Sequence, residues 1–249
     1  MCGIIGVFGN DNAGRLAAVG LFAEQHRGQE SCGMAVSDGL LIRLHKKMGL
    51  VKEVFHEEQL NALPGKIAIG HVRYPTKGSA TEFNTQPHLV ETLSGPCYAL
   101  ASNGDLVNYA QVRKMLENEK VYFKSDNDAE LLVKYIAYRI LHYKENIGDA
   151  IRNLMRDIKG AYSSVLCTPT ELYMFRDPYS IRPMIWGKTP EGTVIVASES
   201  CALDTLGVQD RKEVPPAGII KVSDSKIEVL DNDPNLYREG NCEKHCIFE

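Results

Sequence analysis

The order of short apolar segments along the chain is the feature that most constrains its fold. Nine short runs show the alternation or continuous apolar character typical of β-strands. These predicted strands are Ile4–Phe8, Met34–Val36, Leu41–Leu44, Ile67–Val72, Tyr98–Ala101, Tyr162–Leu166, Leu172–Phe175, Val194–Ala197 and Ile219–Val222. The strands come in groups, and helices lie between the groups. This order predicts an α+β fold with antiparallel sheets rather than a doubly wound parallel sheet.

Helical periodicity marks five further segments. They are Leu16–Gln25, Leu50–Phe55, Gln111–Asn118, Ala129–Tyr143 and Ile147–Ile158. The clearest of them follows Asp126, Asn127 and Asp128, which are all favourable N-cap residues. The polar connection between Arg73 and His88 is long, and we expect it to be a lid or binding loop without regular structure of its own.

Composition excludes several classes of function. The 249 residues include 28 basic and 32 acidic ones, and the net charge of −4 argues against binding to nucleic acid or an anionic membrane. There is no run of 18 apolar residues, no repeat and no linker, so we expect one domain without a transmembrane helix. The N-terminus lacks a basic region, and the seven cysteines do not show the spacing of a disulfide framework. We therefore expect reduced thiols, no secretory signal and a cytoplasmic location.

Cys2 stands directly behind the initiator methionine in the stretch MCGIIGVFG. A thiol needs a base to become a nucleophile. Removal of Met1 would give Cys2 a free α-amine, whose ordinary pKa of about 7.7–8.0 suits a base near neutral pH. The alternative is a small apolar residue buried at the start of a strand.

Asn103 and Gly104 in the stretch SNGDL are candidates for an oxyanion hole. A side-chain amide and a backbone N–H that both point at a developing oxyanion typically contribute about 3–4 kcal/mol each to a lower barrier. The alternative is a turn, because Asn-Gly between apolar runs is a common turn signal.

Arg73 and Asp128 together could hold an α-amino acid. The guanidinium of Arg73, at the end of an apolar strand, would bind a carboxylate through two parallel hydrogen bonds. Asp128, at a predicted helix start, would bind an ammonium group. Taken singly, Arg73 is also consistent with a solvated surface arginine and Asp128 with a helix cap.

Near the C-terminus, the stretch CEKHC contains Cys242, His245 and Cys246. Their close spacing is typical of metal ligands, but they supply at most three of the four ligands of a closed zinc or iron–sulfur site. The alternative is a pendant tail.

Several longer stretches, taken in order, resemble the amidophosphoribosyltransferase family. They are MCGIIGVFG, QHRGQESCGM, IGHVRYPTKG, SNGDLVN, SDNDAELL, GAYSSVL, FRDPYSIRPM, VASESCALDTLG and CIFE. The resemblance covers essentially the whole chain and is to the glutaminase half of that family, which belongs to the class II glutamine amidotransferases. It implies an N-terminal-nucleophile hydrolase fold, a four-layer α/β/β/α sandwich with two antiparallel sheets.

The resemblance also implies roles for individual residues. Cys2 would attack the carboxamide of L-glutamine, form a glutamyl thioester and release ammonia. Asn103 and Gly104 would form the oxyanion hole, and Arg73 and Asp128 would hold the substrate's α-carboxylate and α-amine. The remaining implied substrate-binding residues are Arg27 and Gly28 on a loop facing the site, and Tyr74 and Thr76 at the lid.

The sequence departs from the family pattern at three places. Ser102 replaces a usual histidine, from which we expect tuning rather than loss of activity. Ser180 replaces a usual glycine, and a residue forced to positive φ there would be strained. The third departure is that residues 1–241 correspond to the glutaminase domain, whereas residues 242–249 correspond only to the start of the connection to a phosphoribosyltransferase domain.

The resemblance sets expectations about cofactors and partners. Glutamine hydrolysis needs no cofactor; magnesium and an iron–sulfur cluster would belong with the other half, and Cys246 aligns with a single cluster ligand. Phosphoribosylamine synthesis from phosphoribosyl pyrophosphate, a step of purine biosynthesis, would require that half in a partner chain or in a longer polypeptide. We expect no nucleic-acid or membrane partner, and a homo-oligomer is left open.

Two other classes of function compete with the enzyme. One is a catalytically silent module of the same fold that senses glutamine or binds a partner. The other is a thiol or metal protein built around the C-terminal cysteines. Release of ammonia from glutamine, and its loss in Cys2→Ala, separates the enzyme from both.

Overall fold

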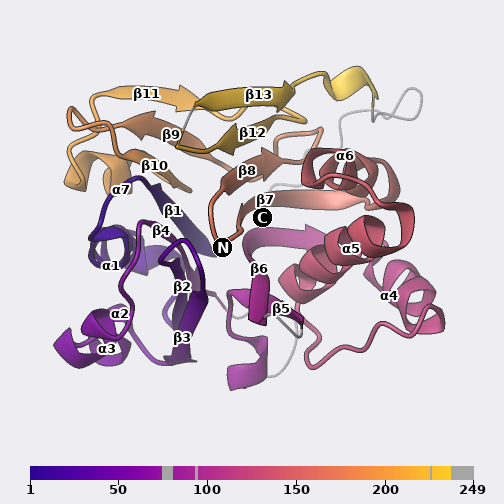
Figure 1. Ribbon diagram of the computed structural model, residues 1–249, viewed down its shortest axis with the longest axis horizontal. Coiled ribbons are helices and arrows are strands. Elements are labelled where there is room, and N and C mark those ends of the chain that lie inside the picture. Colours follow the sequence, from indigo (N-terminus) through magenta and orange to yellow (C-terminus); the bar gives the residue numbers. More distant parts are fainter. Residues whose placement is uncertain (75–80, 93–94, 225, 237–249) are drawn as a thin grey trace.

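The computed structural model describes residues 1–74, 81–92, 95–224 and 226–236. Two antiparallel sheets pack face to face between outer layers of helices (Figure 1). This arrangement confirms the predicted α+β class and the four-layer α/β/β/α sandwich.

The first sheet has seven strands and contains the N-terminal strand near its centre. Its spatial order is β11 (Asp210–Glu213), β9 (Ile185–Lys188), β10 (Val194–Ala197), β1 (Gly3–Phe8), β4 (Ile67–Arg73), β2 (Ser31–Ser37) and β3 (Ile42–Met48). Strand β1 pairs with both β10 and β4, and Gly3 lies opposite Val72. The residue before β1 therefore lies at the end of a strand that is paired on both sides.

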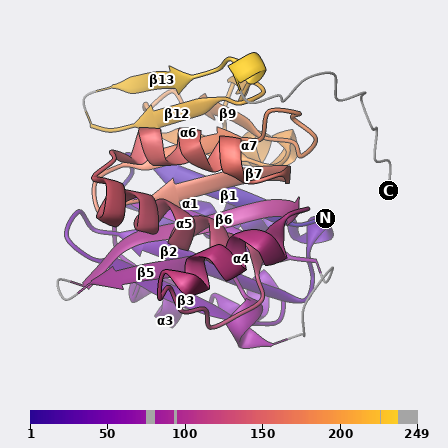
Figure 2. The same cartoon turned by 90° about the vertical axis from the view of Figure 1, so that its right-hand side faces the viewer.

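The second sheet has six strands, and the long strand β6 lies near one side of it. Its order is β13 (Ile227–Asp231), β12 (Ile219–Val222), β8 (Leu172–Arg176), β7 (Gly160–Cys167), β6 (Gly95–Leu106) and β5 (His88–Thr92). Figure 2 shows this half of the sandwich with its covering helices toward the viewer.

Each sheet buries its outer face under its own helices. Helices α1 (Ala13–Ala23), α2 (Val51–Val54) and α7 (Ser200–Thr205) cover the seven-stranded sheet, and α3 (Glu57–Asn61) follows α2. Helices α4 (Tyr109–Asn118), α5 (Asp128–Tyr143) and α6 (Ile147–Asp157) cover the six-stranded sheet. Three short 3₁₀ turns complete the described elements: η1 (Gln25–Arg27), η2 (Glu82–Asn84) and η3 (Pro234–Leu236).

A third apolar cluster lies between the sheets and is built from both of them. Ile4 and Phe8 of β1 and Ile69 of β4 contribute from one side, and Ala101 of β6 and Val165 of β7 from the other. At about 25 cal/mol per Å² of apolar surface removed from water, this layer is a principal source of the sandwich's stability.

All nine predicted strands and all five predicted helices are present, with ends that shift by a few residues. The strands β5, β9, β11 and β13 were not predicted. They lie at or near sheet edges, and β11 consists of four exposed polar residues, Asp-Arg-Lys-Glu, so it has no apolar alternation to detect. Charged edge strands of this kind also discourage pairing with other chains.

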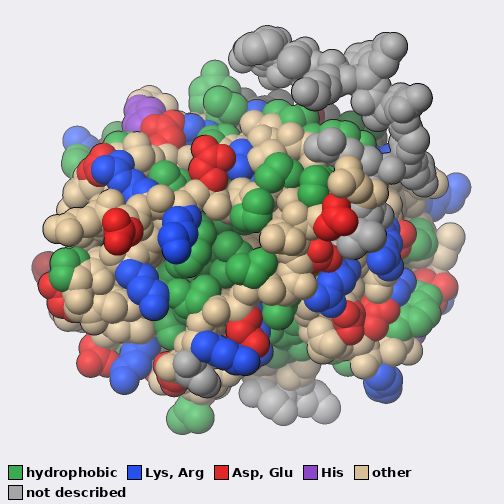
Figure 3. Space-filling model, turned by 90° about the horizontal axis from the view of Figure 1, so that it is seen from above, with side chains coloured by type: hydrophobic (Ala, Val, Ile, Leu, Met, Phe, Trp, Pro, Cys, Tyr) green, Lys and Arg blue, Asp and Glu red, His purple; other side chains and the backbone are tan. Residues whose placement is uncertain are grey.

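Figure 3 looks down on the upper margin of Figure 1, where β11 and β13 lie. Charged side chains of both signs border a patch of hydrophobic ones on this face. Among the described helices, none is both long and apolar enough to cross a membrane.

The connection from Arg73 to His88 differs from expectation in its described second half. It contains η2, and its residues Asn84, Thr85 and Gln86 are buried. Their polar groups are satisfied locally: Asn84 Oδ1 accepts from the Asp126 N–H, and the side chain of Gln86 bonds to the backbone of Ser102. The expectation of a connection without structure is wrong for this half, because polar contacts anchor it where apolar ones are few.

Ser180 has φ +58°, in the left-handed region that favours glycine. It closes a turn in which its N–H bonds to Asp177 Oδ1 at 2.9 Å, and its carbonyl accepts from Arg176 Nη2 at 2.9 Å. The positive φ on which the expected strain depends is therefore present, and these two hydrogen bonds between backbone and side chains hold the residue in place.

Replacing Ser180 by glycine should therefore stabilise the protein. The left-handed conformation costs an L-residue roughly 1–2 kcal/mol, and the extra freedom of glycine in the unfolded chain offsets part of the gain. We expect Ser180→Gly to add about 0.5–1 kcal/mol to the free energy of unfolding, measured by denaturant titration. Ser180→Ala, which keeps the Cβ atom, is the matched control, and an equal gain in both variants would contradict the argument.

Candidate active site

Cys2 lies immediately before β1, and in Figure 1 the N-terminus sits between the two halves of the sandwich. Its Sγ contacts the carbonyl oxygen of Tyr74 at 3.9 Å. Burial raises the pKa of this thiol, and the Tyr74 contact, the N-terminal amine, Arg73 and Arg27 only partly oppose the effect. A thiol in this setting needs a base in order to react.

Strand parity decides which side chains face the space between the sheets. In β1 the even-numbered Ile4 and Phe8 join the inter-sheet core, whereas Ile5 and Val7 face the outer helices. The same alternation directs Cys2 toward the inter-sheet side.

The same parity argument applies to β4 and β6. In β4, Ile67 and Ile69 face the inter-sheet layer, which puts Arg73 on that side. In β6, Ala99 and Ala101 face it, which puts Asn103 there as well. Three residues far apart in sequence are thus directed into one layer from both of its walls.

Asn103 lies within the continuous strand β6, opposite Ser163 of β7, so the turn alternative is wrong. The side chain is buried, and its Nδ2 has no hydrogen-bond partner within the parts of the chain that the structure describes. Buried amide donors are nearly always satisfied in native proteins. The unpartnered N–H groups are therefore available to a ligand oxygen.

Gly104 allows β6 and β7 to approach closely. A Cβ atom at this position would lie 2.8 Å from the carbonyl oxygen of Ala161 and 2.8 Å from Tyr162 Cβ. Any larger residue would have to displace the backbone of the neighbouring strand next to Asn103.

Asp128 is the first residue of α5 rather than its cap. The N-cap is Asn127, whose side chain accepts from the Ala129 N–H at 2.9 Å. Asp128 Oδ2 instead accepts from the N–H of Leu106 at 3.1 Å. This contact places the carboxylate two residues along β6 from Gly104.

Arg73 is buried, so the alternative of a solvated surface arginine is wrong. Its Nη1 bonds to Glu30 Oε2 at 2.5 Å, and Glu30 N–H returns a bond to the Arg73 carbonyl at 3.1 Å. A charge-assisted pair of this kind fixes the guanidinium at the end of β4.

His71 of β4 is buried two residues before Arg73, and neither of its ring nitrogens has a hydrogen-bond partner within the described parts of the chain. Burial lowers the pKa of its imidazole to about 3, and the charge of Arg73 lowers it further while the backbone of Ser102 opposes the shift. The imidazole is therefore neutral near pH 7 beside the charge of Arg73.

Ser102 itself is directed toward the helical layer by parity with Leu100 and Leu106. Its Oγ bonds to Ser164 Oγ at 2.8 Å, and its backbone bonds to Gln86. The departure from histidine at this position thus lies on the opposite face of β6 from the Asn103 side chain.

Arg27 and Gly28 bring the η1 turn against Cys2 and the end of β4. Arg27 Nε donates to the carbonyl of Cys2 at 2.9 Å, and its Nη1 pairs with Glu199 Oε1. A Cβ atom on Gly28 would lie 2.5 Å from the Val72 carbonyl oxygen. Glycine at this position therefore allows the η1 turn to pack directly against the backbone of β4 near Cys2.

Three acidic residues at this site were not predicted from the sequence: Glu24, Glu30 and Glu199. Glu24 is buried beneath Gly3, where an added Cβ would lie 2.8 Å from Glu24 Oε2. Its Oε1 accepts from the Glu199 N–H at 2.8 Å. Glu30 lies directly beside the HRGQ stretch, which was the only sequence signal available for it.

Some predicted residues lie outside the described parts of the chain. They are Thr76 at the lid, and Cys242, His245 and Cys246 near the C-terminus, together with the proposed connection 242–249. Tyr74 lies within the described residues. It is half-exposed, and its carbonyl oxygen contacts Cys2 Sγ.

With this geometry established, the chain can be compared with known proteins. Residues 77–205, just over half of the chain, match the family described as a glutamine amidotransferase domain. The chain belongs to this family of glutamine amidotransferase domains, which confirms the class of enzyme that its sequence resembles.

The particular relatives are amidophosphoribosyltransferases. The chain is 38% identical to that of Methanocaldococcus jannaschii, over all of this chain and 53% of the relative, and 39% identical to that of Bacillus subtilis, over 95% and 49%. It therefore spans about half the length of these relatives.

Solved structures agree with this assignment. The B. subtilis glutamine phosphoribosylpyrophosphate amidotransferase complexed with ADP and GMP superposes with a TM-score of 0.83 at 36% identity, covering 93% of this chain and 50% of that one. A glutamine aminotransferase class-II domain protein from Silicibacter pomeroyi shares the fold, with a TM-score of 0.57 at 15% identity, over 94% of this chain and all of that one.

Glu24 gives this site a measurable dependence of stability on pH. Burial raises the pKa of its carboxyl from 4.5 to about 8. Between pH 4.5 and about 8 the folded protein keeps this proton, whereas the unfolded chain has lost it. The free energy of unfolding therefore falls as pH rises through this range.

Replacing Glu24 by glutamine removes this titration and keeps an oxygen to accept from Glu199. Between about pH 5.5 and about pH 7.5, we expect the free energy of unfolding of Glu24→Gln, relative to the unaltered protein, to rise by about 1–3 kcal/mol. Denaturant titration at both pH values measures it. A difference that stays constant with pH would show that Glu24 ionises normally.

Proposed function

We propose that this chain hydrolyses L-glutamine to glutamate and ammonia, with Cys2 as the nucleophile. The observation that carries the proposal is the buried, unpartnered Asn103 amide, which strand parity directs into the same layer as Cys2. An amide donor kept free of partners is what stabilisation of a developing oxyanion requires.

The substrate would be held at both ends of its α-amino acid moiety. Arg73, fixed by Glu30, would bind the α-carboxylate, and Asp128, fixed by Leu106, would bind the α-ammonium group. Arg27 and Gly28 would line the opposite edge, and Tyr74 and Thr76 would belong to the covering segment. The carboxamide would then extend toward Cys2 and Asn103.

The reaction would proceed through a thioester. Cys2 Sγ would give its proton to a base and attack the carboxamide carbon, and the oxyanion would accept from Asn103 Nδ2 and the Gly104 N–H. Collapse of this intermediate would break the C–N bond and release ammonia, which takes up the proton. Water would then hydrolyse the thioester to glutamate and restore the thiol.

The base would be the α-amine of Cys2 after removal of Met1. Partial burial, together with the charges of Arg27 and Arg182, lowers the pKa of the Met1 α-amine at this location. The same surroundings would favour the neutral, proton-accepting form of an amine on Cys2.

The ammonia would be used by a phosphoribosyltransferase half. The relatives are named amidophosphoribosyltransferases and are about twice the length of this chain, which supports such a half in a partner chain or a longer polypeptide. Glutamine hydrolysis itself would need no cofactor, whereas magnesium and any cluster ligated by Cys246 would belong with that half. We further propose a cytoplasmic location.

Ammonia release from glutamine tests the proposal directly. The chain should release ammonia with weak basal activity and no response to phosphoribosyl pyrophosphate, and Cys2→Ala should abolish the release. A fusion whose cleavage leaves Cys2 as the first residue tests the base, because activity should appear only after cleavage.

Each other outcome has a definite reading. A folded chain with a free Cys2 that binds glutamine without releasing ammonia would support the catalytically silent module. Equal activity before and after cleavage would rule out the α-amine as base. Stimulation by phosphoribosyl pyrophosphate would show that this chain binds that compound unaided.

The substrate clamp makes a separate prediction. Arg73→Lys keeps the charge but loses the two parallel hydrogen bonds, worth roughly 1.5–3 kcal/mol. We expect the KM for glutamine to rise about 10- to 100-fold with a smaller effect on kcat, and Asp128→Asn to behave similarly. Arg43→Lys, at a partly exposed arginine paired with Asp38, is the matched control. An unchanged KM in both clamp variants would exclude the clamp.

A further inference from the structure

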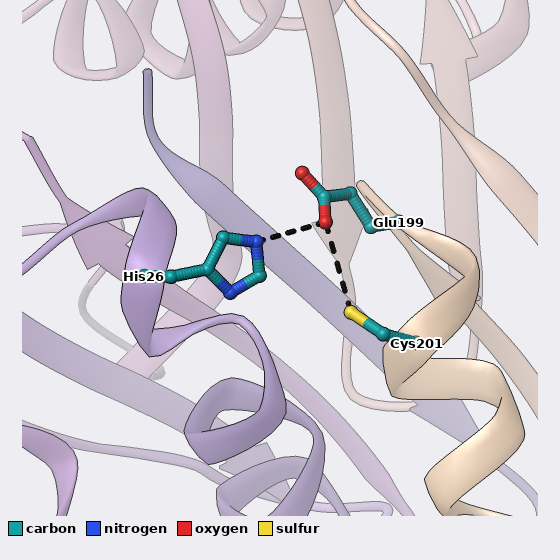
Figure 4. Close-up of side chains that lie close together, drawn as sticks. All are labelled: His26, Glu199 and Cys201. Atoms are coloured by element: carbon teal, nitrogen blue, oxygen red, sulfur yellow. Dashed lines mark hydrogen bonds and ion pairs between the residues drawn. The ribbon is translucent and has the colours of Figure 1, made fainter.

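Three side chains that the proposed chemistry does not use converge beside the active site. They are His26 of the η1 turn, Glu199 just before α7, and Cys201 in the first turn of α7, and Figure 4 shows them pointing toward one another. His26 Nε2 lies 2.9 Å from Glu199 Oε2, and Cys201 Sγ lies 3.7 Å from the same oxygen. One atom from each residue falls within 4.8 Å of the other two.

These atoms have the chemistry of a zinc site. Imidazole nitrogen, carboxylate oxygen and thiolate sulfur all bind Zn²⁺, at about 2.0–2.3 Å. Around a tetrahedral ion, such ligand atoms lie roughly 3.3–3.8 Å apart. The Cys201–Glu199 pair already has this spacing, the His26–Glu199 pair needs to separate by about 0.5 Å, and the His26 and Cys201 atoms, which lie within 4.8 Å of each other, need to approach by at most about 1 Å. We propose that His26, Glu199 and Cys201 form a three-ligand site for Zn²⁺, with the fourth position open to water.

The surrounding structure holds the ligands in place. Arg27 pairs with Glu199 Oε1 and leaves Oε2 for the metal, an outer contact of the kind that orients ligating carboxylates. The backbone N–H of Glu199 is fixed by Glu24 Oε1. Helices α1 and α7 share the apolar cluster on this face of the sheet, which keeps the η1 turn and the start of α7 together.

An ion could reach these ligands from solvent. The His26 side chain is 56% exposed and that of Glu199 is 34% exposed. Cys201 would bind as thiolate and give its proton to solvent. Arg27 contacts both Glu199 and the carbonyl of Cys2, so it links the proposed metal ligand Glu199 to the nucleophile.

Cobalt(II) is the probe for this site, because a thiolate ligand gives it a charge-transfer absorption band and a tetrahedral site gives intense visible bands. The full chain should carry Cys2→Ala, Cys242→Ser and Cys246→Ser, which removes the nucleophile and the C-terminal cysteines as ligands. We expect this protein to bind one equivalent of Co²⁺ with both signatures, and Zn²⁺ to displace it.

Variants in the same background identify the ligands. Cys201→Ser should abolish the charge-transfer band, and His26→Gln should weaken Co²⁺ binding by about tenfold or more. Cys97→Ser is the matched control and should bind normally, because once Cys2 is replaced Cys97 is the other partly buried cysteine among the described residues. Circular dichroism confirms that each variant is folded.

Two results would overturn the site. One is the absence of a charge-transfer band in the folded background protein. The other is a band that survives Cys201→Ser, which would place the ion on another thiol. Neither depends on glutamine hydrolysis, so the zinc site and the proposed activity stand or fall separately.

Discussion

The face-to-face packing of two antiparallel sheets is the constraint on which the rest of the structure depends. Because side chains alternate across a strand, the burial of Ile4 and Phe8 between the sheets fixes the direction of every other residue in β1 and of Cys2 before it. A register shift of one residue would turn Cys2, Arg73 and Asn103 away from one another. The apolar core therefore also determines the geometry of the candidate active site.

Polar groups at the edge of this core are arranged in pairs that limit the cost of their burial. Arg73 is matched by Glu30, and Arg27 by Glu199. The Asn103 amide nitrogen is one of several buried polar atoms at this site without a partner in the described structure, together with Glu24 Oε2 and Arg27 Nη2. Unmatched donors persist where a ligand satisfies them. The Arg27–Glu199 pair additionally links the backbone of Cys2 to the cluster of His26 and Cys201, so the active site and the proposed zinc site share one structural support.

The sequence predicted those elements in which buried apolar and exposed polar side chains alternate with a regular period. Strand β1 and helix α5 each carry a clear apolar pattern and were located to within one residue at each end. Strand β11 carries none, because all four of its residues are exposed and are held by backbone bonds to β9 and by charged contacts such as the Arg211–Asp204 ion pair. The buried second half of the Arg73–His88 connection was missed for a related reason. Its anchors are polar, and polar anchors such as Gln86 leave no periodic signal.

For the candidate site, the sequence by itself supplied the chemical groups: a thiol at position two, an Asn-Gly pair, an arginine and an aspartate, in an order that identified the family. It could not show that Arg73 is buried or that Asn103–Gly104 continues a strand. Both facts depend on neighbours that are distant in sequence. Glu24, Glu30 and Glu199 likewise became part of the site only through folding, since an isolated glutamate has no sequence pattern that distinguishes it from a solvated one. The chemical groups of the site are properties of single residues and can be read from the sequence. Burial and pairing arise from contacts between strands that only the tertiary structure brings together.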